Sequence, residues 1–393
     1  MPNRVQFDGR PVWAEVSLGA VAKNLRAVRR HVGRRRKILA IVKANAYGHG
    51  AVPVAKALAK AGADWFGVTC VAEGAELRAS GVRQPILVLS GFWPGEERRL
   101  IEHRLTPAIT HIEQFHHLER AIASAARSRR IRGPYAVHLK IDTGMNRLGV
   151  PPVEMRAVAQ ALADSPHLRL DGTFTHFASA EDFTSDQTGQ QESLFRAAIE
   201  RLHAERVNPG ILHLANSAAV AKRPESWADM VRPGAILYGY HQFFEPIERK
   251  AEAEQMLPLQ PAFSLRSRVI SMRDVPAGGG VGYNARFVTE RPSRIAVLAA
   301  GYADGIVRAL TNRGRVLLRG RCAPIIGIVS MDLAMVDVTS LPDVRLGDVA
   351  TIYGSAGPGG PAIWASDVAR LLGSVTSDLL CAVGPRVPRF YLS

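Results

Sequence analysis

Short apolar runs alternate with amphipathic stretches through the first two thirds of the chain. In the amphipathic stretches, apolar residues recur at helical spacing over 52–61, 72–79, 112–126, 153–163 and 190–206. The eight apolar runs predict buried parallel strands over 38–42, 65–69, 86–90, 105–109, 136–141, 170–175, 211–214 and 231–237. Eight strands separated by helices predict an α/β fold, a (β/α)8 TIM-like barrel. A doubly wound open sheet is the competing arrangement, and the count of eight favours the barrel.

The pattern of apolar and polar residues changes after Pro246. Residues 259–354 carry short runs of Val, Ile and Leu broken by glycine-rich turns, and few helical patterns remain except 365–372. This pattern predicts a mainly β C-terminal domain after the barrel. We expect an N-terminal segment, 1–12, that packs with the C-terminal domain, then a barrel over 13–245 and the β domain over 246–393.

Composition excludes a disordered chain, because 47% of the 393 residues are hydrophobic and only 22% are charged. The formal net charge is +15, and only 8 of the 50 basic residues are lysines. The densest basic runs, 34–37 and 127–132, lie between a predicted helix and a predicted strand and hold no aromatic residues. We therefore expect an arginine-biased surface and no nucleic-acid binding.

The three cysteines, Cys70, Cys322 and Cys381, have neither the number nor the spacing of a disulfide framework or a zinc site, and no metal is expected. Residues 1–16 lack the basic and apolar regions of a signal peptide. No stretch approaches 18 uninterrupted apolar residues, so no membrane segment is expected. We expect a soluble cytoplasmic protein.

A lysine ends the first apolar run. After 38–42 come Lys43, Tyr47, Gly48 and Gly50, and then a predicted helix. The carboxyl ends of barrel strands form the active site of this fold. A lysine there is partly desolvated, which favours the neutral amine that Schiff-base chemistry needs. The alternative is a lysine that extends to solvent at the rim of the barrel.

The run 42–50 (VKANAYGHG) resembles the pyridoxal phosphate (PLP) signature of the alanine racemase family, in which the lysine forms the internal aldimine. The resemblance covers about residues 11–391. Further segments follow in the order of the family, and they are 139–149 (LKIDTGMNRLG), 175–178 (THFA), 213–217 (HLANS), 232–234 (RPG), 282–283 (GY), 301–305 (GYADG), 330–332 (SMD) and 386–389 (RVPR). Each segment alone is weak evidence for the family. All of them together, at these spacings, make a chance match implausible.

The resemblance implies a cytoplasmic isomerase that interconverts L- and D-alanine through a PLP aldimine and supplies D-alanine for peptidoglycan. Its substrate would be a small amino acid, and its active sites would be shared within a homodimer. One base on each face of the substrate is the simplest arrangement for racemisation; Lys43 would serve one face, and the resemblance implies Tyr283 of the second subunit for the other. A tyrosine with the ordinary pKa near 10 is a poor base at neutral pH. We therefore expect cationic neighbours, the set His176, Arg232 and His213, to favour its phenolate form.

The resemblance also assigns cofactor and substrate contacts. Arg232 would face the pyridine nitrogen of PLP and, because arginine keeps its proton, donate a hydrogen bond without protonating the ring. Backbone amides and hydroxyls suit the phosphate; these are Ser217, Gly234, Ala235 and the Tyr47 hydroxyl. The other implied contacts are His176 and Asn216 for the cofactor, Arg147 for the cofactor and the substrate carboxylate, and Tyr302, Met331 and Asp332 for the substrate.

Lys140 is the second lysine inside a predicted strand, and alternation places it on one face with His138 and Asp142. Pointing into a barrel, it would be an uncompensated buried charge unless it is paired or modified. Family members often carry a carbamylated lysine here that orients the following arginine, so we expect carbamylated Lys140 to orient Arg147. A plain ion pair with Asp142 or a glutamate is the alternative.

Ser377 and Asp378 depart from the family, which usually has a Tyr-Glu pair at these positions, with the tyrosine touching the PLP phosphate and narrowing the substrate entrance. A roomier site puts strict alanine preference in doubt, because a methylene changes selectivity by only about 1–3 kcal/mol. A racemase of broader specificity, acting on serine or other small amino acids, is therefore one alternative function. A non-catalytic PLP-binding protein is another, although such proteins lack a β domain.

Overall fold

The computed structural model describes residues 9–127, 133–357 and 359–393. They form two compact units. The barrel unit holds residues 20–46 and 51–260, and the β unit holds residues 9–19, 47–50 and 261–393. From the sequence, we predicted domain boundaries after residues 12 and 245; the structure has them after residues 19 and 260, and residues 47–50 also belong to the β unit. Residues 1–8 of the expected N-terminal segment and residues 128–132 of the second basic run lie outside the described residues.

Eight parallel strands form the sheet of the barrel unit, in the order β8-β7-β6-β5-β4-β3-β2-β9. Their bounds are β2 (Lys37–Ile41), β3 (Trp65–Val68), β4 (Ile86–Val88), β5 (Thr106–Ile109), β6 (Tyr135–Lys140), β7 (Leu168–Phe174), β8 (Ile211–His213) and β9 (Met230–Val231). Backbone hydrogen bonds from Asp229 to Leu212 (3.0 Å) and from Arg232 to Ala215 (2.9 Å) join the two ends of the sheet. The predicted barrel is therefore confirmed over the open sheet.

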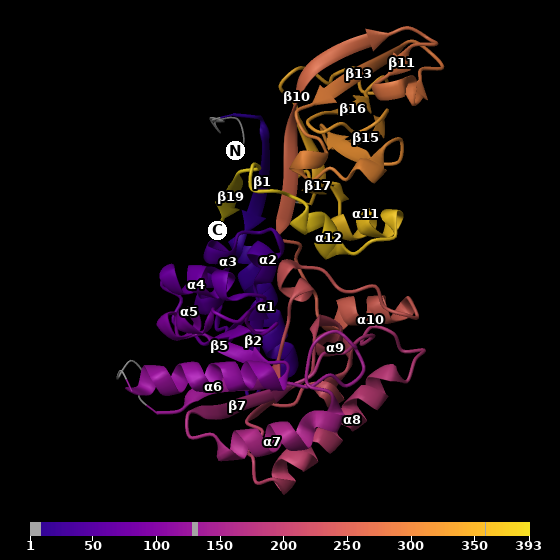
Figure 1. Cartoon of the computed structure of the whole chain (residues 1–393). Coiled ribbons are helices and arrows are strands. Elements are labelled where there is room, and N and C mark those ends of the chain that lie inside the picture. The colour runs from indigo at the N-terminus through magenta and orange to yellow at the C-terminus, as the bar shows by residue number, and fades with distance from the viewer. Residues whose placement is uncertain (1–8, 128–132, 358) are drawn as a thin grey trace. The chain divides into compact units, whose positions relative to one another are not determined.

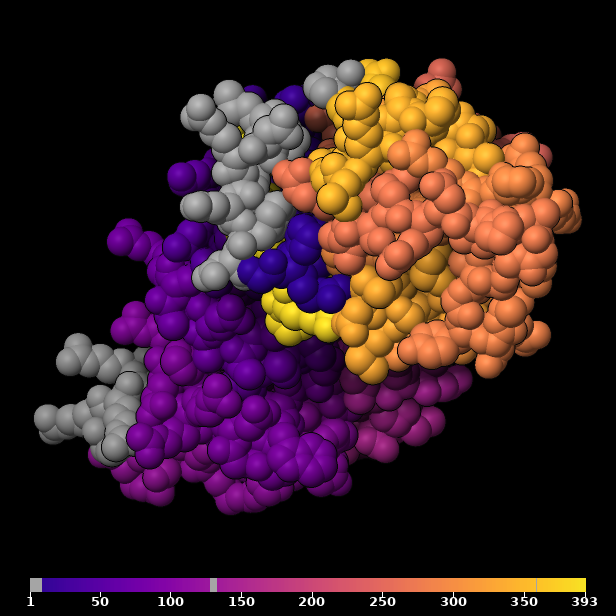
Figure 2. Space-filling view, turned by 90° about the horizontal axis from the view of Figure 1, so that it is seen from above, coloured from indigo at the N-terminus to yellow at the C-terminus, as the bar shows by residue number. Residues whose placement is uncertain are grey.

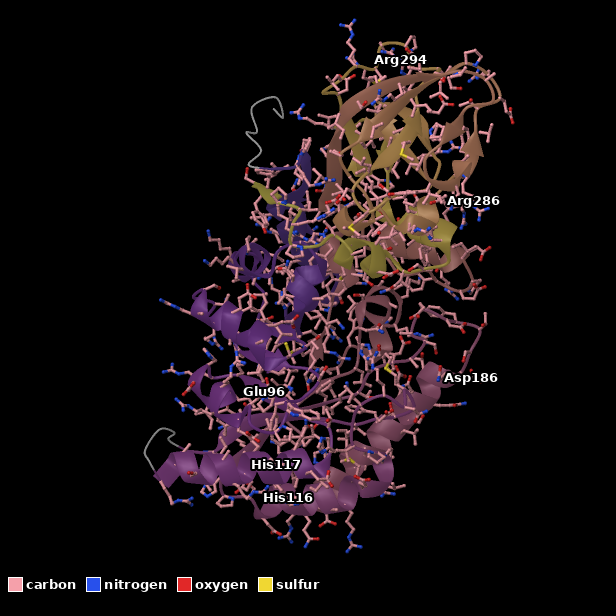
Figure 3. The ribbon with its side chains drawn as sticks, turned by 45° about the horizontal axis from the view of Figure 1, so that its top comes forward. Glu96, His116, His117, Asp186, Arg286 and Arg294 are labelled. Atoms are coloured by element: carbon pink, nitrogen blue, oxygen red, sulfur yellow. The ribbon has the colours of Figure 1, made fainter. Side chains whose placement is uncertain are left out.

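Helices cover the outer face of this sheet (Figure 1). Their bounds are α1 (Leu18–Val32), α3 (Ala51–Ala61), α4 (Val71–Ala79), α5 (Glu97–Glu102), α6 (Ile112–Arg127), α7 (Met155–Asp164), α8 (Gln187–Ala204), α9 (Ser217–Lys222) and α10 (Glu248–Met256). Helix α6 shows why they form: Phe115, Leu118 and Ile122 recur at helical spacing and are buried. The labelled side chains of His116 and His117 belong to the same helix, and His116 is exposed (Figure 3).

The last barrel strand is shorter than its apolar run predicts. The run 231–237 predicts a strand, but β9 ends at Val231 and residues Ala235–Tyr238 form a 3-10 helix, η3. Pro233 explains the difference, because proline has no amide hydrogen for the sheet and interrupts a central strand. The chain therefore turns out of the sheet immediately after Arg232, at the carboxyl end of the barrel.

The β unit contains a nine-stranded sheet in the order β18-β17-β14-β15-β16-β13-β10-β1-β19. Its strands are β1 (Val12–Ser17), β10 (Phe263–Val275), β13 (Ser293–Leu298), β14 (Arg315–Leu318), β15 (Arg321–Ile326), β16 (Ala334–Asp337), β17 (Val349–Ser355), β18 (Ala362–Ile363) and β19 (Arg389–Leu392). The first and last strands pair here in parallel, β1 with β19, and Figure 2 shows the indigo residues beside the yellow ones. This confirms the predicted mainly β character of the second part.

Smaller elements complete the β unit. A hairpin of β11 (Gly280–Val281) and β12 (Phe287–Val288) encloses the 3-10 turn η4 (Tyr283–Ala285). Helix α11 (Ala365–Leu372) agrees with its predicted bounds, and α12 (Thr376–Cys381) follows it. Within the described ranges, no helix is long and apolar enough to cross a membrane.

Candidate active site

Lys43 begins an unusual turn at the carboxyl end of β2. The next four residues, Ala44 to Tyr47, all have positive φ values, between 51° and 54°. This left-handed conformation costs non-glycine residues roughly 1–2 kcal/mol each and persists only where the surroundings impose it. The amide of Ala46 donates to the carbonyl of Val42 (2.9 Å), and the side chain of Asn45 accepts from Ala51 at the start of α3 (2.8 Å). Strain of this kind is concentrated at functional sites.

Four basic side chains of the barrel unit converge at the carboxyl ends of its strands. Burial, followed by the charges of Arg147 and Arg232, lowers the pKa of Lys140 to about 8, and Lys43 adds to this effect. The same groups, after burial, lower the pKa of His176 well below its ordinary value. We expected Lys43, Arg147, His176 and Arg232 at one site. Within the barrel unit, the structure brings these residues and Lys140 together.

Arg232 is the centre of a buried hydrogen-bond network. Its two terminal nitrogens donate to the carbonyls of Thr175 (2.7 Å), His213 (2.5 Å) and Leu214 (2.8 Å). They also reach Nδ1 of His176 (3.3 Å) and Nδ1 of His213 (3.2 Å). Burial lowers the pKa of Arg232 to about 9, so the guanidinium remains charged at neutral pH. Among the described residues, none accepts a hydrogen bond from its Nε.

The two histidines beside Arg232 are neutral, which corrects the expectation of a cationic set of three. Burial, with Arg232 second, lowers the pKa of both His176 and His213 well below the ordinary value. Because Nδ1 of His213 accepts from Arg232, its Nε2 carries the proton and donates to Nδ1 of His138 (2.9 Å). The positive charge at this position therefore belongs to Arg232 alone.

Lys140, at the end of β6, has no carboxylate partner among the described residues. Its Nζ lies 5.8 Å from the centre of the Phe174 ring, and the side chain is buried. Asp142 is occupied elsewhere: its oxygens accept from the amides of residues 144–147 at 2.9–3.0 Å. Burial alone would raise the pKa of Asp142, but these four bonds lower it overall. The plain Lys140–Asp142 ion pair is therefore wrong.

The expected phosphate ligands lie after β8 and β9. The amide of Gly234 donates to Oγ of Ser217 (2.8 Å), so these two residues touch and the Ser217 hydroxyl hydrogen remains available to another acceptor. Asn216 is the N-cap of α9, where its side chain accepts from the amide of Ala219 (3.1 Å). Ala235 begins the 3-10 helix η3. Asn216 thus has a structural role that the sequence did not anticipate.

The expected substrate residues Tyr302, Met331 and Asp332 lie side by side in the β unit. The amide of Tyr302 donates to Ser330 (2.9 Å), which aligns the segments 302–304 and 330–332. An ion-pair cluster that was not predicted from the sequence joins Asp332 to the neighbouring Asp304. Arg386 donates to the buried Asp304 (2.8 Å) and to Asp332 (2.9 Å), and Arg10 lies 3.3 Å from Asp304. Nearly 300 residues separate Arg10 from Asp304, so no local pattern could have indicated it.

Tyr283 and Tyr47 also belong to the β unit. Tyr283 lies on the exposed hairpin turn, with 68% of its surface accessible, and the labelled Arg286 lies on the same segment (Figure 3). Burial, followed by Cys381, raises the pKa of Tyr47, so its hydroxyl stays protonated and can donate. Lys43 and Tyr283 belong to different units, so the pairing of these two bases stays a prediction.

Glu73 is a further residue that the sequence analysis missed. It lies in the first turn of α4, and its carboxylate accepts from the amide of Ala44, the residue after Lys43. A carboxylate in the first turn of a helix is usually explained by the helix dipole alone, so the sequence carried no distinctive signal.

Comparison with known proteins identifies the family. The sequence model of the alanine racemase N-terminal domain matches residues 16–242, and that of the C-terminal domain matches residues 262–391. The alanine racemase of Symbiobacterium thermophilum is 39% identical over 388 residues, covering 98% of this chain and 99% of its own. That of Geobacter sulfurreducens is 39% identical over 390 residues, covering 98% of each chain.

Solved structures agree with the sequence relatives. Alanine racemase from D-cycloserine-producing Streptomyces lavendulae superposes with a TM-score of 0.89 at 34% identity, covering 98% of each chain. The biosynthetic alanine racemase of Pseudomonas aeruginosa gives 0.83 at 37% identity, covering 98% of this chain and all of its own. The chain therefore belongs to the alanine racemase family, whose members are PLP-dependent isomerases.

Proposed function

We propose that this protein interconverts L- and D-alanine with PLP held at the carboxyl end of the barrel. The convergence of Lys43, Lys140, Arg147 and Arg232 carries the proposal. The carboxylate of Asp142 acts on Lys140, but its oxygens are taken by backbone amides. Such a site favours anions, and the cofactor phosphate, the cofactor phenolic oxygen and the substrate carboxylate are all anionic.

The residues present also fit the individual parts of PLP. Arg232 would donate its Nε, which no described residue occupies, to the pyridine nitrogen. Ser217, with its hydroxyl hydrogen available, Gly234, Ala235 and the Tyr47 hydroxyl would bind the phosphate, and His176 and Asn216 would line the site. Arg147 would bind the phenolic oxygen and the substrate carboxylate.

The chemistry that PLP supplies when bound is withdrawal of electrons from the α-carbon of the amino acid. The amine of Lys43 would then move the α-proton on one face, and the phenolic oxygen of Tyr283 would move it on the other. Arg232 would hold the pyridine nitrogen by a hydrogen bond without giving up its own proton, because its pKa of about 9 lies above neutral. Because the pyridine ring would stay unprotonated, it would withdraw electrons less strongly. This disfavours protonation at carbons other than the α-carbon of the substrate.

The assembly belongs to the proposal as well. Tyr283 would act in the site of a second copy, so the enzyme would be a homodimer with shared active sites. Its 68% exposure in the single chain supports this, as does the exposure of Tyr302 and Met331 in the same unit. We place the enzyme in the cytoplasm, where D-alanine would supply peptidoglycan synthesis; the similar protein of Pseudomonas aeruginosa is a biosynthetic alanine racemase.

A chiral assay tests the proposed function directly. The purified protein with PLP is incubated separately with L-alanine, D-alanine and L-serine, and the enantiomers are separated by chromatography. We expect both alanine reactions to end at equal amounts, because enantiomers have equal free energies in water. Alanine that keeps its configuration in the PLP-loaded protein would contradict the proposal and favour a non-catalytic PLP-binding protein.

Broader specificity remains the second candidate, and Ser377 is the observation that favours it. Ser377 is half-buried on α12, in place of the usual tyrosine of the family. Helix α12 packs against the segment after Lys43: a Cβ on Gly48 would lie 2.2 Å from the carbonyl oxygen of Leu380. The helix that carries Ser377 is thus fixed against residues 47–50. In the chiral assay, racemisation of serine supports broader specificity and turnover of alanine alone opposes it.

Carbamylation of Lys140 remains a proposal that the burial of its amine supports. The ammonium first loses one proton. The neutral amine then adds to CO2: an N–C bond forms, one C=O π bond of CO2 breaks and a second proton is released, so a positive group becomes a negative one. An amine with a pKa of about 8 is neutral in about a tenth of molecules at pH 7, far more than an ordinary lysine. The resulting carbamate would be attractive to Arg147, Arg232 and Lys43, where the ammonium is repulsive.

Labelled bicarbonate checks the modification of Lys140. With ¹³C-bicarbonate, we expect one protein carbamate signal by NMR, absent from Lys140→Ala and kept in Lys60→Ala, which removes an exposed lysine of α3. At constant dissolved CO2 the signal should rise as the pH passes upward through about 8, because the neutral amine is the reactive form. A spectrum of the wild-type protein without this signal would contradict the carbamylation of Lys140.

A further inference from the structure

Glu73 joins two loops at the carboxyl ends of neighbouring barrel strands. Its Oε1 accepts from the amide of Ala44, after β2, and its Oε2 accepts from the amide of Thr69, after β3, each at 2.7 Å. Strands β2 and β3 pair in parallel, with Ile41 opposite Gly67. One carboxylate therefore fixes the two chain segments that leave adjacent strands at the same edge of the sheet.

Only one of the two bonds to Glu73 is expected from the start of helix α4. Thr69 precedes Glu73 by four residues, so its bond is the ordinary satisfaction of an amide near a helix start. Ala44 is 29 residues away and follows Lys43 directly. A helix start alone does not require this bond. It fixes the first residue of the left-handed run that begins after Lys43.

The left-handed run has its own internal bonds only further along. Ala46 donates back to Val42, and Asn45 accepts from Ala51. Ala44, with a φ of 51°, is restrained by the carboxylate of Glu73 instead. The amide of Ala44 belongs to the planar peptide group that joins it to Lys43. Loosening this bond would therefore free that peptide plane and, with it, the direction in which the Lys43 side chain leaves the backbone.

We infer that Glu73 is a positioning residue that sets the direction of the Lys43 amine by holding the amide of Ala44. The inference rests on the proposed role of Lys43. Both carboxylate oxygens are used on backbone amides, so Glu73 acts through the backbone and not on the substrate. The position needs two acceptors in a fork: glutamine offers one acceptor and a donor group that repels the second amide, and aspartate is one methylene shorter.

Glu73→Gln is the sharp test, with Glu76→Gln as the matched control on the exposed face of the same helix. In Glu73→Gln, we expect kcat for alanine to fall between about 10- and 100-fold, since small misplacements of a reacting group cost this much. The KM should change little. Glu73→Asp should lie between the wild type and Glu73→Gln, and Glu76→Gln should match the wild type.

Two measurements separate positioning from general weakening and do not need racemisation. Hydrogen exchange of the PLP-loaded protein should quicken in the peptide 43–47 of Glu73→Gln while the peptide 112–127 of α6 stays unchanged. Borohydride trapping of PLP on Lys43 should slow in the same variant. A Glu73→Gln protein whose trapping rate and exchange equal those of the wild type would overturn the inference. Because both readouts precede turnover, they remain decisive even if the protein proves not to racemise alanine.

Discussion

Replacing Lys43 by alanine should abolish racemisation of alanine, with a loss of about 10⁴-fold or more in kcat. Lys43 is proposed to do two things at once, to hold PLP covalently and to move the α-proton on one face. General acid–base catalysis alone contributes up to about 10⁴-fold, and loss of the covalent attachment adds to it. The chiral assay measures the loss of turnover, and borohydride reduction followed by peptide mass spectrometry should find no PLP on peptide 42–50.

Two variants control this experiment. Lys43→Arg keeps the positive charge but supplies no amine for covalent attachment, so it should be as inactive as Lys43→Ala. Lys56→Ala removes an exposed lysine from α3 and should leave turnover and trapping unchanged. Racemisation by Lys43→Ala within tenfold of the wild type would mean that another group performs both roles, and the proposed mechanism would then fail.

The barrel could be predicted from the sequence because its signals are local. Each strand is a short apolar run, and the order of runs and amphipathic stretches specifies the topology. The strand predicted over 231–237 is wrong beyond Val231 because apolar residues continue past Pro233 into the 3-10 helix Ala235–Tyr238. The periodicity of an apolar run does not distinguish a strand from a short buried helix.

The candidate site was predictable where a motif follows a strand, and not where contacts are distant in sequence. Lys43, Lys140 and Arg232 each lie at or just after a strand end, so topology alone gathers them. The bond between Glu73 and Ala44 and the pair of Arg10 with Asp304 depend on the folded chain. The left-handed run after Lys43 could not be predicted for another reason: only Asn45 among its four residues is of a type that tolerates positive φ, and one such residue does not indicate a run of four.

Charge states could not be predicted from residue types. The resemblance led to the expectation that His176, Arg232 and His213 form a cationic set, but burial and the charge of Arg232 lower the pKa of both histidines and make them neutral. Lys140 and Asp142 look like an ion pair, but four backbone amides occupy the carboxylate. Burial decides the first case and backbone hydrogen bonds decide the second, and both exist only in the folded site.

The second large effect is expected at Tyr283. In Tyr283→Phe, racemisation should fall by about 10²–10⁴-fold, because a base on one face is lost while the other remains. In D2O, exchange of the α-proton should persist for the enantiomer whose proton faces Lys43 and nearly stop for its mirror image. Tyr391→Phe, which removes the hydroxyl of another partly exposed tyrosine of the same unit, should leave both rates unchanged. Equal losses of exchange for the two enantiomers would contradict a face-specific role.

Mixing two inactive proteins tests whether Tyr283 works in the site of a second copy. If Lys43 and Tyr283 in one site come from different subunits, a dimer of one Lys43→Ala chain and one Tyr283→Phe chain has one intact site and one doubly defective site. Random exchange of subunits should then restore about a quarter of wild-type turnover, because half of the dimers are mixed and each has one working site. Native mass spectrometry confirms that exchange has occurred. Mixed dimers without restored turnover would show that Tyr283 does not act across the subunit interface, and the shared site would be excluded while the role of Lys43 stands.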